Sequence, residues 1–139
     1  MRAVFDPNVI ISALLSPSGH SAHLLSAWSK GEFELIVSAK LIDELGRAVG
    51  YPKLRRHIPE REASRVVQWL TESATVASDP IEAARVRSPD PGDDYLIALA
   101  ASRQAMLVSG DKHLLDLADR IPVLTPAAFV NRLDESPTH

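Results

Sequence analysis

The sequence predicts an α/β protein with three layers, an α/β/α sandwich in which helices cover both faces of a central, mostly parallel sheet of four or five strands. Short apolar segments alternate along the chain with longer segments whose apolar residues recur at helical spacing. The 139 residues are enough for one hydrophobic core, and no linker or internal repeat divides them. We therefore expect a single domain over residues 1–135, followed by a flexible tail at 136–139.

Several residues mark where the predicted elements begin and end. Pro7 disfavours helical geometry at the residue before it, so Asp6 is expected to end an extended strand. Asn8 is expected to cap the helix that follows, as Ser38 does for a later helix. Pro126 suits the first position of the last helix. In order, we predict a strand at 2–5, helices at 9–15 and 21–30, a strand at 34–37, helices at 39–49 and 59–72, a minor strand at 75–77, a helix ending at 103, a strand at 105–108, a helix through 118, a strand at 121–124 and a last helix.

Composition narrows the classes of protein that this chain can belong to. It has no run of eighteen apolar residues, so we expect no membrane span. The absence of cysteine excludes disulfides and thiolate metal sites and is typical of a cytoplasmic protein. The net charge of -3 at first argues against a nucleic-acid ligand. Setting aside four candidate metal ligands (Asp6, Glu44, Asp94 and Asp111) leaves a charge of +1, so charge neither selects nor excludes such a ligand.

Two acidic residues come directly after predicted strands. Asp6 follows the first strand, and Asp111 follows the strand at 105–108, after Ser109 and Gly110. Ligands of open parallel sheets bind outside the carboxyl ends of the strands, which makes both aspartates candidate site residues. Taken singly, each is equally well explained as an aspartate of a turn or a helix cap.

Glu44 is a third candidate, on the predicted helix at 39–49. It lies at the edge of the apolar face of that helix, beside Leu41 and Ala48. A carboxylate turned toward the interior costs free energy unless a charged group meets it. The alternative for Glu44 is a side chain that bends back out to water.

Three more acids occur between residues 90 and 94. Asp90, placed before Pro91, fits a helix N-cap, and Asp93 fits the acidic position of a capping box. Asp94 has no such structural explanation, and small residues share its side of the next helix. We therefore favour Asp94 as a site residue, with Asp93 as the second choice.

Four carboxylates gathered at one edge of a sheet would either take up protons or hold a cation, because they repel each other. Ligand sets made only of oxygen favour Mg²⁺ or Mn²⁺ over zinc. Such a metal polarises a phosphate and lowers the pKa of a bound water, which is the chemistry of phosphodiester hydrolysis. The gathering of these acids is inferred from the predicted fold and not from their spacing alone.

Four segments of the chain, taken in order, resemble the motifs of the PIN-domain family. They are VFDPNV at 4–9, Glu44 after a short strand, DDYLIALA at 93–100 and LVSGD at 107–111. The segments 32–44 and 51–54 further resemble the VapC-like toxins of toxin–antitoxin systems. Each motif is weak alone, whereas four in this order are fairly specific, and together they cover nearly the whole chain.

The resemblance implies an α/β/α sandwich, cleavage of RNA with Mg²⁺ or Mn²⁺, inhibition by a cognate antitoxin and, frequently, a homodimer. Matched by motif, Asp6, Glu44, Asp94 and Asp111 would be the acidic metal ligands and catalytic residues. Asn8, Ser109 and Asp93 would be supporting polar groups of the site.

Two positions depart from the family pattern. Pro7 stands where the family usually has Thr or Ser, so one hydroxyl and one N–H are missing near Asp6. His113 replaces an acid that many relatives carry. These departures bear on the rate and the metal affinity more than on the fold, and they leave open a degenerate member that only binds a partner.

Another alternative is a phosphatase of the haloacid-dehalogenase type, in which Asp6 would be the nucleophile and Asp111 and Asp116 would belong to the last motif. Asn8, however, occupies the place of the acid/base aspartate of that family, and Glu44 would have no role there. A dinucleotide-binding protein is not expected, because the chain has neither a glycine-rich fingerprint nor a P-loop lysine.

Other polar and aromatic residues have simpler explanations. The basic stretch at 53–65 is explained at least as well by a solvated helix face as by contact with RNA phosphates. His20 and His23 have a spacing that can bind zinc, but no other ligand is near in sequence, so we expect surface histidines. Trp28 and Trp69 are expected in the core or at an interface.

Overall fold

The structure is a computed structural model that describes residues 1–82 and 84–135. Its sheet consists of β1 (Arg2–Phe5), β2 (Glu34–Ser38), β3 (Thr75–Ala77), β4 (Met106–Val108) and β5 (Val123–Leu124). The spatial order is β3-β2-β1-β4-β5, and each pair of neighbours is parallel. The predicted parallel sheet is therefore confirmed, with five strands. The tail expected at 136–139 lies outside the described residues.

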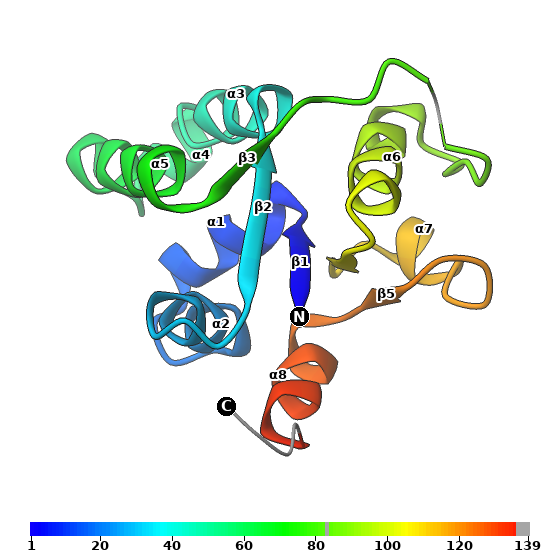
Figure 1. Cartoon of the computed structure of the whole chain (residues 1–139). Helices are drawn as coiled ribbons and strands as arrows, with labels where there is room; N and C mark the ends of the chain where they lie inside the picture. The colour runs from blue at the N-terminus through cyan, green and yellow to red at the C-terminus, as the bar shows by residue number, and fades with distance from the viewer. Residues whose placement is uncertain (83, 136–139) are drawn as a thin grey trace.

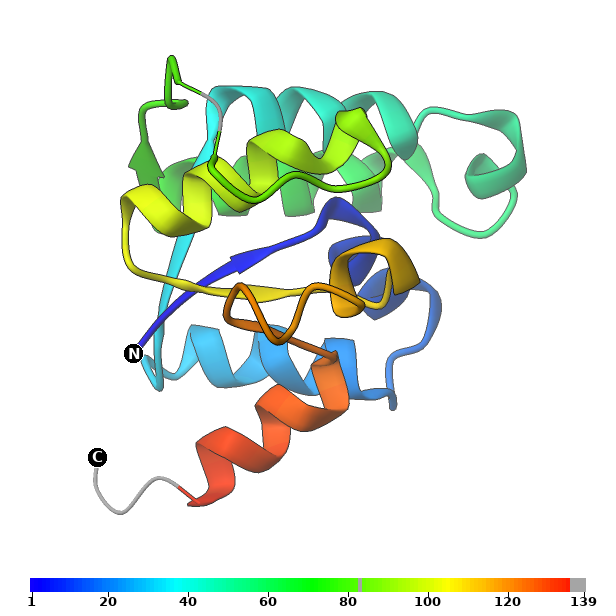
Figure 2. The same ribbon diagram turned by 90° about the vertical axis from the view of Figure 1, so that its right-hand side faces the viewer.

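Helices cover both faces of this sheet. They are α1 (Pro7–Leu15), α2 (His20–Ser29), α3 (Ala39–Ala48), α4 (Pro52–Arg55), α5 (Glu60–Ser73), α6 (Asp94–Ser102), α7 (Lys112–Leu115) and α8 (Pro126–Glu135), with a 3₁₀ turn at Pro91–Asp93 before α6. Figure 1 shows α3, α4 and α5 together at one side of the sheet, and Figure 2 shows α3 and α6 on one face and α2 and α8 on the other. The three-layer prediction is confirmed.

Four details differ from the sequence prediction. The first helix begins at Pro7, and its cap is Asp6 instead of Asn8. The missing N–H of Pro7 costs the helix nothing, since the first turn has no internal partner for it. Helix α7 ends at Leu115 after a single turn, and β5 begins at Val123 because Pro122 has no N–H to give to a strand ladder. The short α4 was not predicted, because one turn carries no repeating apolar pattern.

Aromatic side chains join distant parts of the core. Phe5 of β1, Phe33 and Phe129 of α8 form a cluster, and the rings of Phe33 and Phe129 meet edge-on with their centroids 5.2 Å apart. The rings of Trp28 and Trp69 lie 4.5 Å apart and connect α2 to α5. The expectation of a core position is met by Trp28, and Trp69 packs against the same core while half-buried.

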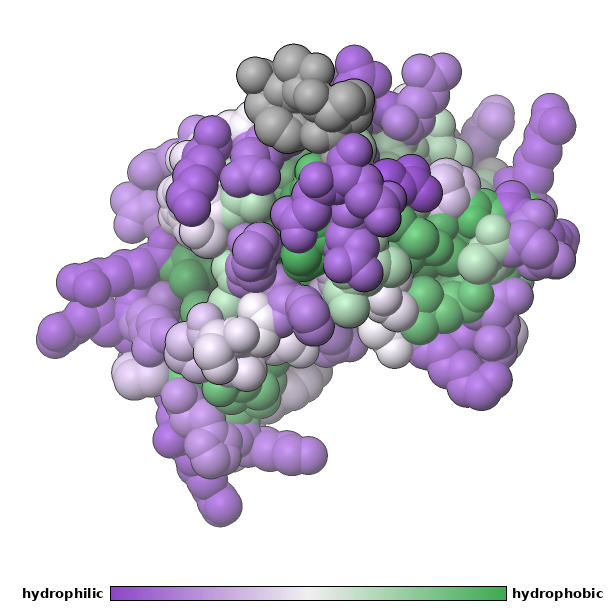
Figure 3. Space-filling view, turned by 90° about the horizontal axis from the view of Figure 1, so that it is seen from below, coloured by the Kyte–Doolittle hydropathy of each residue, from purple (hydrophilic) through white to green (hydrophobic). Residues whose placement is uncertain are grey.

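The surface is mostly hydrophilic on the side seen from below in Figure 3, and apolar side chains show there as separate patches. Among the described residues, large exposed hydrophobic side chains are scattered over different elements, at Met1, Leu15, Tyr51, Val76 and Ile81. None of the helices in the described part of the chain is long and apolar enough to cross a membrane.

Candidate carboxylate site

The candidate site begins at the carboxyl ends of the two central strands, β1 and β4. These strands pair in parallel with Phe5 opposite Val108, so the residues that follow them, Asp6 and Ser109, come out side by side. The backbone supports this placement, because the N–H of Asp6 donates to the carbonyl of Val108 at 3.0 Å. Figure 2 shows that α1 and α7 both start at this edge of the sheet.

Ser109 links the two strand ends through one hydroxyl group. Its Oγ donates to Oδ2 of Asp6 at 2.8 Å and accepts the backbone N–H of Asp111 at 3.0 Å. Ser109 is fully buried, so both bonds are made away from water. Ser109 therefore fixes Asp6 relative to the turn that carries Asp111, as expected for a supporting polar group.

Asp6 is a buried carboxylate, with only 4% of its surface exposed. Its Oδ1 accepts the backbone N–H of Asn8 at 3.0 Å, and its Oδ2 accepts from Ser109. Burial raises the pKa of Asp6, and the negative charges of Asp111 and Glu44 raise it further, although the two hydrogen bonds oppose this. The sequence offered a capping role and a site role as alternatives for Asp6. The structure shows the capping role, and its position beside the other acids is compatible with the site role.

Asp93, the second choice from the sequence, faces the same group of acids. Burial, a hydrogen bond with Asp111 and the charge of Asp6 raise the pKa of Asp93 to about 7. The pKa of Asp111 is lowered by the hydrogen bond from Asp93 and by the backbone N–H of His113. Asp93 and Asp111 therefore influence each other's protonation, as expected for two carboxyl groups held close together.

Asp94, the first choice from the sequence, is engaged elsewhere. Its Oδ1 accepts the backbone N–H of Ser88 at 2.7 Å, and its Oδ2 lies 3.9 Å from the guanidinium of Arg87. Asp94 therefore holds the loop before α6, and it is Asp93 that interacts with Asp6 and Asp111. The capping box expected at Asp93 does not form, because the Asp93 side chain makes no cap hydrogen bond. The preference for Asp94 over Asp93 stays a prediction, and the contacts of Asp94 with Ser88 and Arg87 favour Asp93 in our proposal below.

Glu44 reaches the site from α3 and is held by a residue that the sequence argument missed. The hydroxyl of Tyr95, on α6, donates to Oε2 of Glu44. Burial and the neighbouring acids, above all Glu44, raise the pKa of Tyr95, so its hydroxyl stays a donor. The Nζ of Lys40 lies 4.8 Å from the centre of the Tyr95 ring. A hydroxyl on an otherwise apolar helix next to two aspartates was the signal available for Tyr95.

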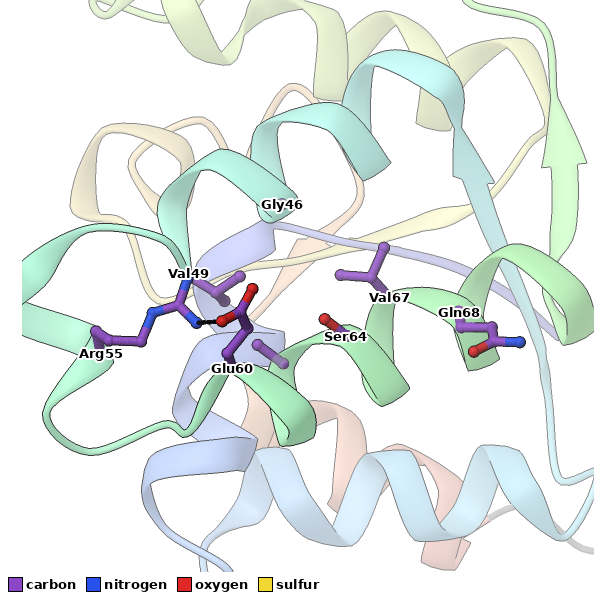
Figure 4. A pocket seen from close by; sticks show the side chains of 8 residues that line it. Gly46, Val49, Arg55, Glu60, Ser64, Val67 and Gln68 are labelled. Carbon is purple, nitrogen blue, oxygen red and sulfur yellow. Dashed lines mark ion pairs between the residues drawn. The ribbon is translucent and has the colours of Figure 1, made fainter.

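Two hollows in the surface differ in their position relative to the candidate acids. One, of about 390 Å³, opens beside Asp111 and is lined by Asn8, Ser12 and Ser21 among others. Another, between α3, α4 and α5, contains the ion pair of Arg55 with Glu60 at 3.7 Å and no candidate acid (Figure 4). Asp111 is the candidate acid that lines the first hollow.

The parallel α/β/α sandwich with acids at its carboxyl edge defines the class of protein, and sequence comparison gives the family. Residues 2–113 match the profile of the PIN domain. This is most of the chain, and the chain therefore belongs to the PIN-domain family, as the four motifs predicted. An uncharacterized protein of Methanocaldococcus jannaschii, MJ1680, is 27% identical over 147 aligned positions, which cover 97% of this chain and 93% of the relative.

Solved structures share the fold at low sequence identity. PAE2754 from Pyrobaculum aerophilum has a TM-score of 0.69 at 21% identity, with 98% of this chain and 100% of that chain covered. VapBC2 from Rickettsia felis, bound to a DNA fragment from its promoter, gives 0.59 at 14% identity, with 90% and 98% covered. A PilT N-terminus domain protein, SSO1118 from Sulfolobus solfataricus P2, gives 0.53 at 13% identity, with 100% and 98% covered. These likenesses confirm the fold.

Proposed function

We propose that this protein is a metal-dependent ribonuclease that hydrolyses RNA phosphodiester bonds and is the toxin of a toxin–antitoxin pair. The observation that carries the proposal is the group formed by Asp6, Asp93 and Asp111 at the carboxyl edge of the sheet. Burial and the neighbouring acids raise the pKa of Asp6 and raise the pKa of Asp93 to about 7. A cluster of acids with raised pKa values lowers the stability of the fold and is typical of catalytic and ligand-binding sites.

The donor set fits a hard divalent cation in its chemistry. Its ligands are carboxylate oxygens alone, which suit Mg²⁺ or Mn²⁺. The Oδ2 atom of Asp93 is buried without a hydrogen-bond partner among the described residues. Burial and the neighbouring acids raise the pKa of Asp93, and a cation bound there would relieve the repulsion between these acids. As the side chains stand, no three acidic or histidine residues of the described chain are arranged to hold a metal, so binding requires them to close in.

The residues of the chain have distinct parts in the proposed reaction. Asp6, Asp93 and Asp111 would hold the cation, which supplies positive charge to the phosphate and lowers the pKa of a bound water. Ser109 and the N–H of Asn8 keep Asp6 in place. The hydroxyl of Tyr95 orients the carboxylate of Glu44. Glu44 would then accept a proton from the attacking water.

An antitoxin partner and a homodimer belong to the same proposal. The likeness to the toxin–antitoxin protein VapBC2 and the VapC-like segments at 32–44 and 51–54 support the first. The homodimer follows from the family resemblance. A location in the cytoplasm, where the proposed RNA substrate is found, follows from it as well. Membership of the PIN-domain family removes the phosphatase alternative.

Exchanging single acids for their amides tests the site. We expect Asp6→Asn and Asp93→Asn to reduce Mn²⁺-dependent RNA cleavage by roughly a hundredfold or more, because each removes a charged ligand worth several kcal/mol to the transition state. Asp94→Asn keeps most of its activity in this assay, since Asp94 binds the loop at Ser88. Cleavage of a labelled single-stranded RNA at several Mn²⁺ concentrations measures both effects.

Asp43→Asn is the matched control, since Asp43 is an exposed residue of α3 that pairs with Arg47. It should cleave like the wild-type protein, and circular dichroism should show all variants folded. Full activity in Asp93→Asn together with loss in Asp94→Asn would reverse our assignment. A wild-type protein that neither cleaves RNA nor binds Mn²⁺ in titration calorimetry would be the degenerate, partner-binding alternative.

A further inference from the structure

The most basic segment of the chain forms a corner between α3 and α5. Residues 51–65 contain five lysine or arginine side chains and two glutamates, a net charge of +3 in a chain whose total is -3. The segment consists of Tyr51, the single turn of α4 and the beginning of α5. We name four of its exposed residues the basic corner: Tyr51, Lys53, Arg56 and Arg61.

The three cations of the basic corner are exposed, and the ion pairs within residues 1–82 and 84–135 leave them without an acidic partner. Arg55 is the cation of this segment that has one, since it lies 3.7 Å from Glu60 (Figure 4). Arg61 is also in the first turn of α5, where the helix dipole disfavours a positive charge. A solvated helix face therefore does not explain this cation.

Tyr51 supplies an independent observation, because an aromatic ring is exposed beside these cations. It is 61% exposed, and as the cap residue of α4 it makes no side-chain cap hydrogen bond. Tyrosine rings are usually packed against other apolar groups. The bases of single-stranded nucleic acids stack on exposed aromatic rings, and cations follow their backbone. A ring among cations therefore suits a single-stranded nucleic acid better than an acidic protein surface, which would use the charges alone.

The basic corner lies at the same end of the molecule as the carboxylate site. Figure 2 shows α4 at the end where α1 and α7 start. Helix α3 connects the two places, since it contains Glu44 and ends at Ala48, three residues before Tyr51. At the rise of an α-helix, Glu44 lies only about 6 Å before Ala48. A strand whose reacting phosphate is at the carboxylates can therefore continue over the basic corner.

We propose that the basic corner binds the RNA substrate as an unpaired strand beside the point of cleavage, with one base stacked on Tyr51 and backbone phosphates at its three cations. This inference rests on the proposed function for the identity of the ligand. Contacts with phosphates fix the position of a strand without reading its bases, and stacking accepts any base. The basic corner therefore selects single-stranded over double-stranded RNA and does not select a sequence.

Binding of a short labelled single-stranded RNA to the metal-free full chain tests the stacking contact. Tyr51→Ala should weaken binding by roughly tenfold, the effect of losing one stacked base. Tyr51→Phe keeps the ring and should bind as the wild-type protein does. A double-stranded RNA of the same length should bind all three proteins alike, because its bases are paired with each other and cannot stack on the ring.

The salt dependence of binding tests the phosphate contacts. The double variant Lys53→Gln/Arg56→Gln should reduce the slope of log K against log salt by about 1.4, since each phosphate contact with a single strand contributes about 0.7. The matched control is Lys30→Gln/Arg132→Gln, which removes two exposed cations where α2 and α8 end. Figure 2 shows these helix ends at the opposite end of the molecule from α4, so the control should keep the slope.

Weaker RNA binding by Tyr51→Ala and by the Lys53–Arg56 double variant, with an unchanged control, supports the proposal. Equal losses in the double variant and its control would mean general electrostatic attraction and would overturn it, as would unchanged binding by Tyr51→Ala. Tighter binding of polyglutamate than of RNA would indicate an acidic protein partner and also overturn it. Cleavage with a normal KM in both variants refutes this inference while the nuclease function stands. Binding that depends on the basic corner without any cleavage refutes only the nuclease function.

Discussion

At the scale of single residues, the protonation of Asp93 is the most informative property of the site. Its raised pKa, about 7, means that the folded protein keeps a proton that the unfolded chain loses near pH 4. The pKa of Asp6 is also raised. The pKa of Asp111 is lowered, so Asp111 changes the stability only at pH values below the ordinary pKa of an aspartate. The metal-free protein should therefore lose stability as the pH rises from about 4 to about 7.

Asp93→Asn should remove much of this pH dependence. We expect the variant to gain about 1 kcal/mol relative to the wild-type protein between pH 4 and pH 7, a figure reduced because Asp93 is partly exposed and screened. Urea unfolding in EDTA at several pH values measures the difference. Parallel curves for the two proteins would show that Asp93 titrates normally, and saturating Mn²⁺ should reverse the sign of the difference.

The sequence could predict which acids lie near one another, but not which of two neighbouring aspartates faces the others. Asp6, Asp111 and Ser109 follow strands of the central pair, so the topology alone places them together. Asp93 and Asp94 differ by one position, and only the path of the loop at Ser88 decides which carboxylate is used to hold it. Tyr95 was missed for a similar reason, since its contact with Glu44 depends on how α3 and α6 pack beside each other on one face of the sheet.

At the scale of elements, the starts and stops of helices were predicted where a residue has a strong local preference. Gly31 ends α2 with a positive φ of 79° and donates its N–H to the carbonyl of Trp28 at 2.9 Å. Elements without such a signal were predicted less well. The single turn of α4 and the early end of α7 depend on packing that no apolar pattern of a few residues can indicate.

Gly31→Ala isolates the backbone preference at the end of α2. A Cβ at this position meets no atom within 4 Å, so the expected loss of about 1 kcal/mol comes from the left-handed conformation alone. Gly46→Ala is the matched control, because a Cβ there also meets nothing and the residue lies inside α3. It should stabilise the protein by roughly 0.5–1 kcal/mol. Equal effects of the two changes on the urea midpoint would contradict this account.

At the scale of the whole molecule, the aromatic cluster connects layers that lie far apart in the sequence. Phe129 of α8 is fully buried and contacts both Phe5 of β1 and Phe33, which precedes β2. It therefore packs one helical layer onto the centre of the sheet. The same strand positions the site, because Asp6 directly follows Phe5 at the carboxyl end of β1.

Phe129→Ala should lower the free energy of unfolding by roughly 3–5 kcal/mol, because it opens a cavity in a core without other ways to fill it. Val76→Ala, at an exposed position of the edge strand β3, should change it by less than about 0.5 kcal/mol. Thermal and urea unfolding measure both. A small effect of Phe129→Ala would mean that α8 contributes little to the fold, and residual RNA cleavage at low temperature should remain in that variant.

The position of β1 between β2 and β4 has a consequence for biosynthesis. The strand made first is completed on its second side only by residues 106–108, about a hundred positions later. A ribosome-bound chain that ends before this point carries Asp6 and Glu44 but has no Ser109 or Asp111 to assemble with them. A nascent copy thus lacks the complete carboxylate site on which the proposed function depends until nearly four fifths of it has been polymerised.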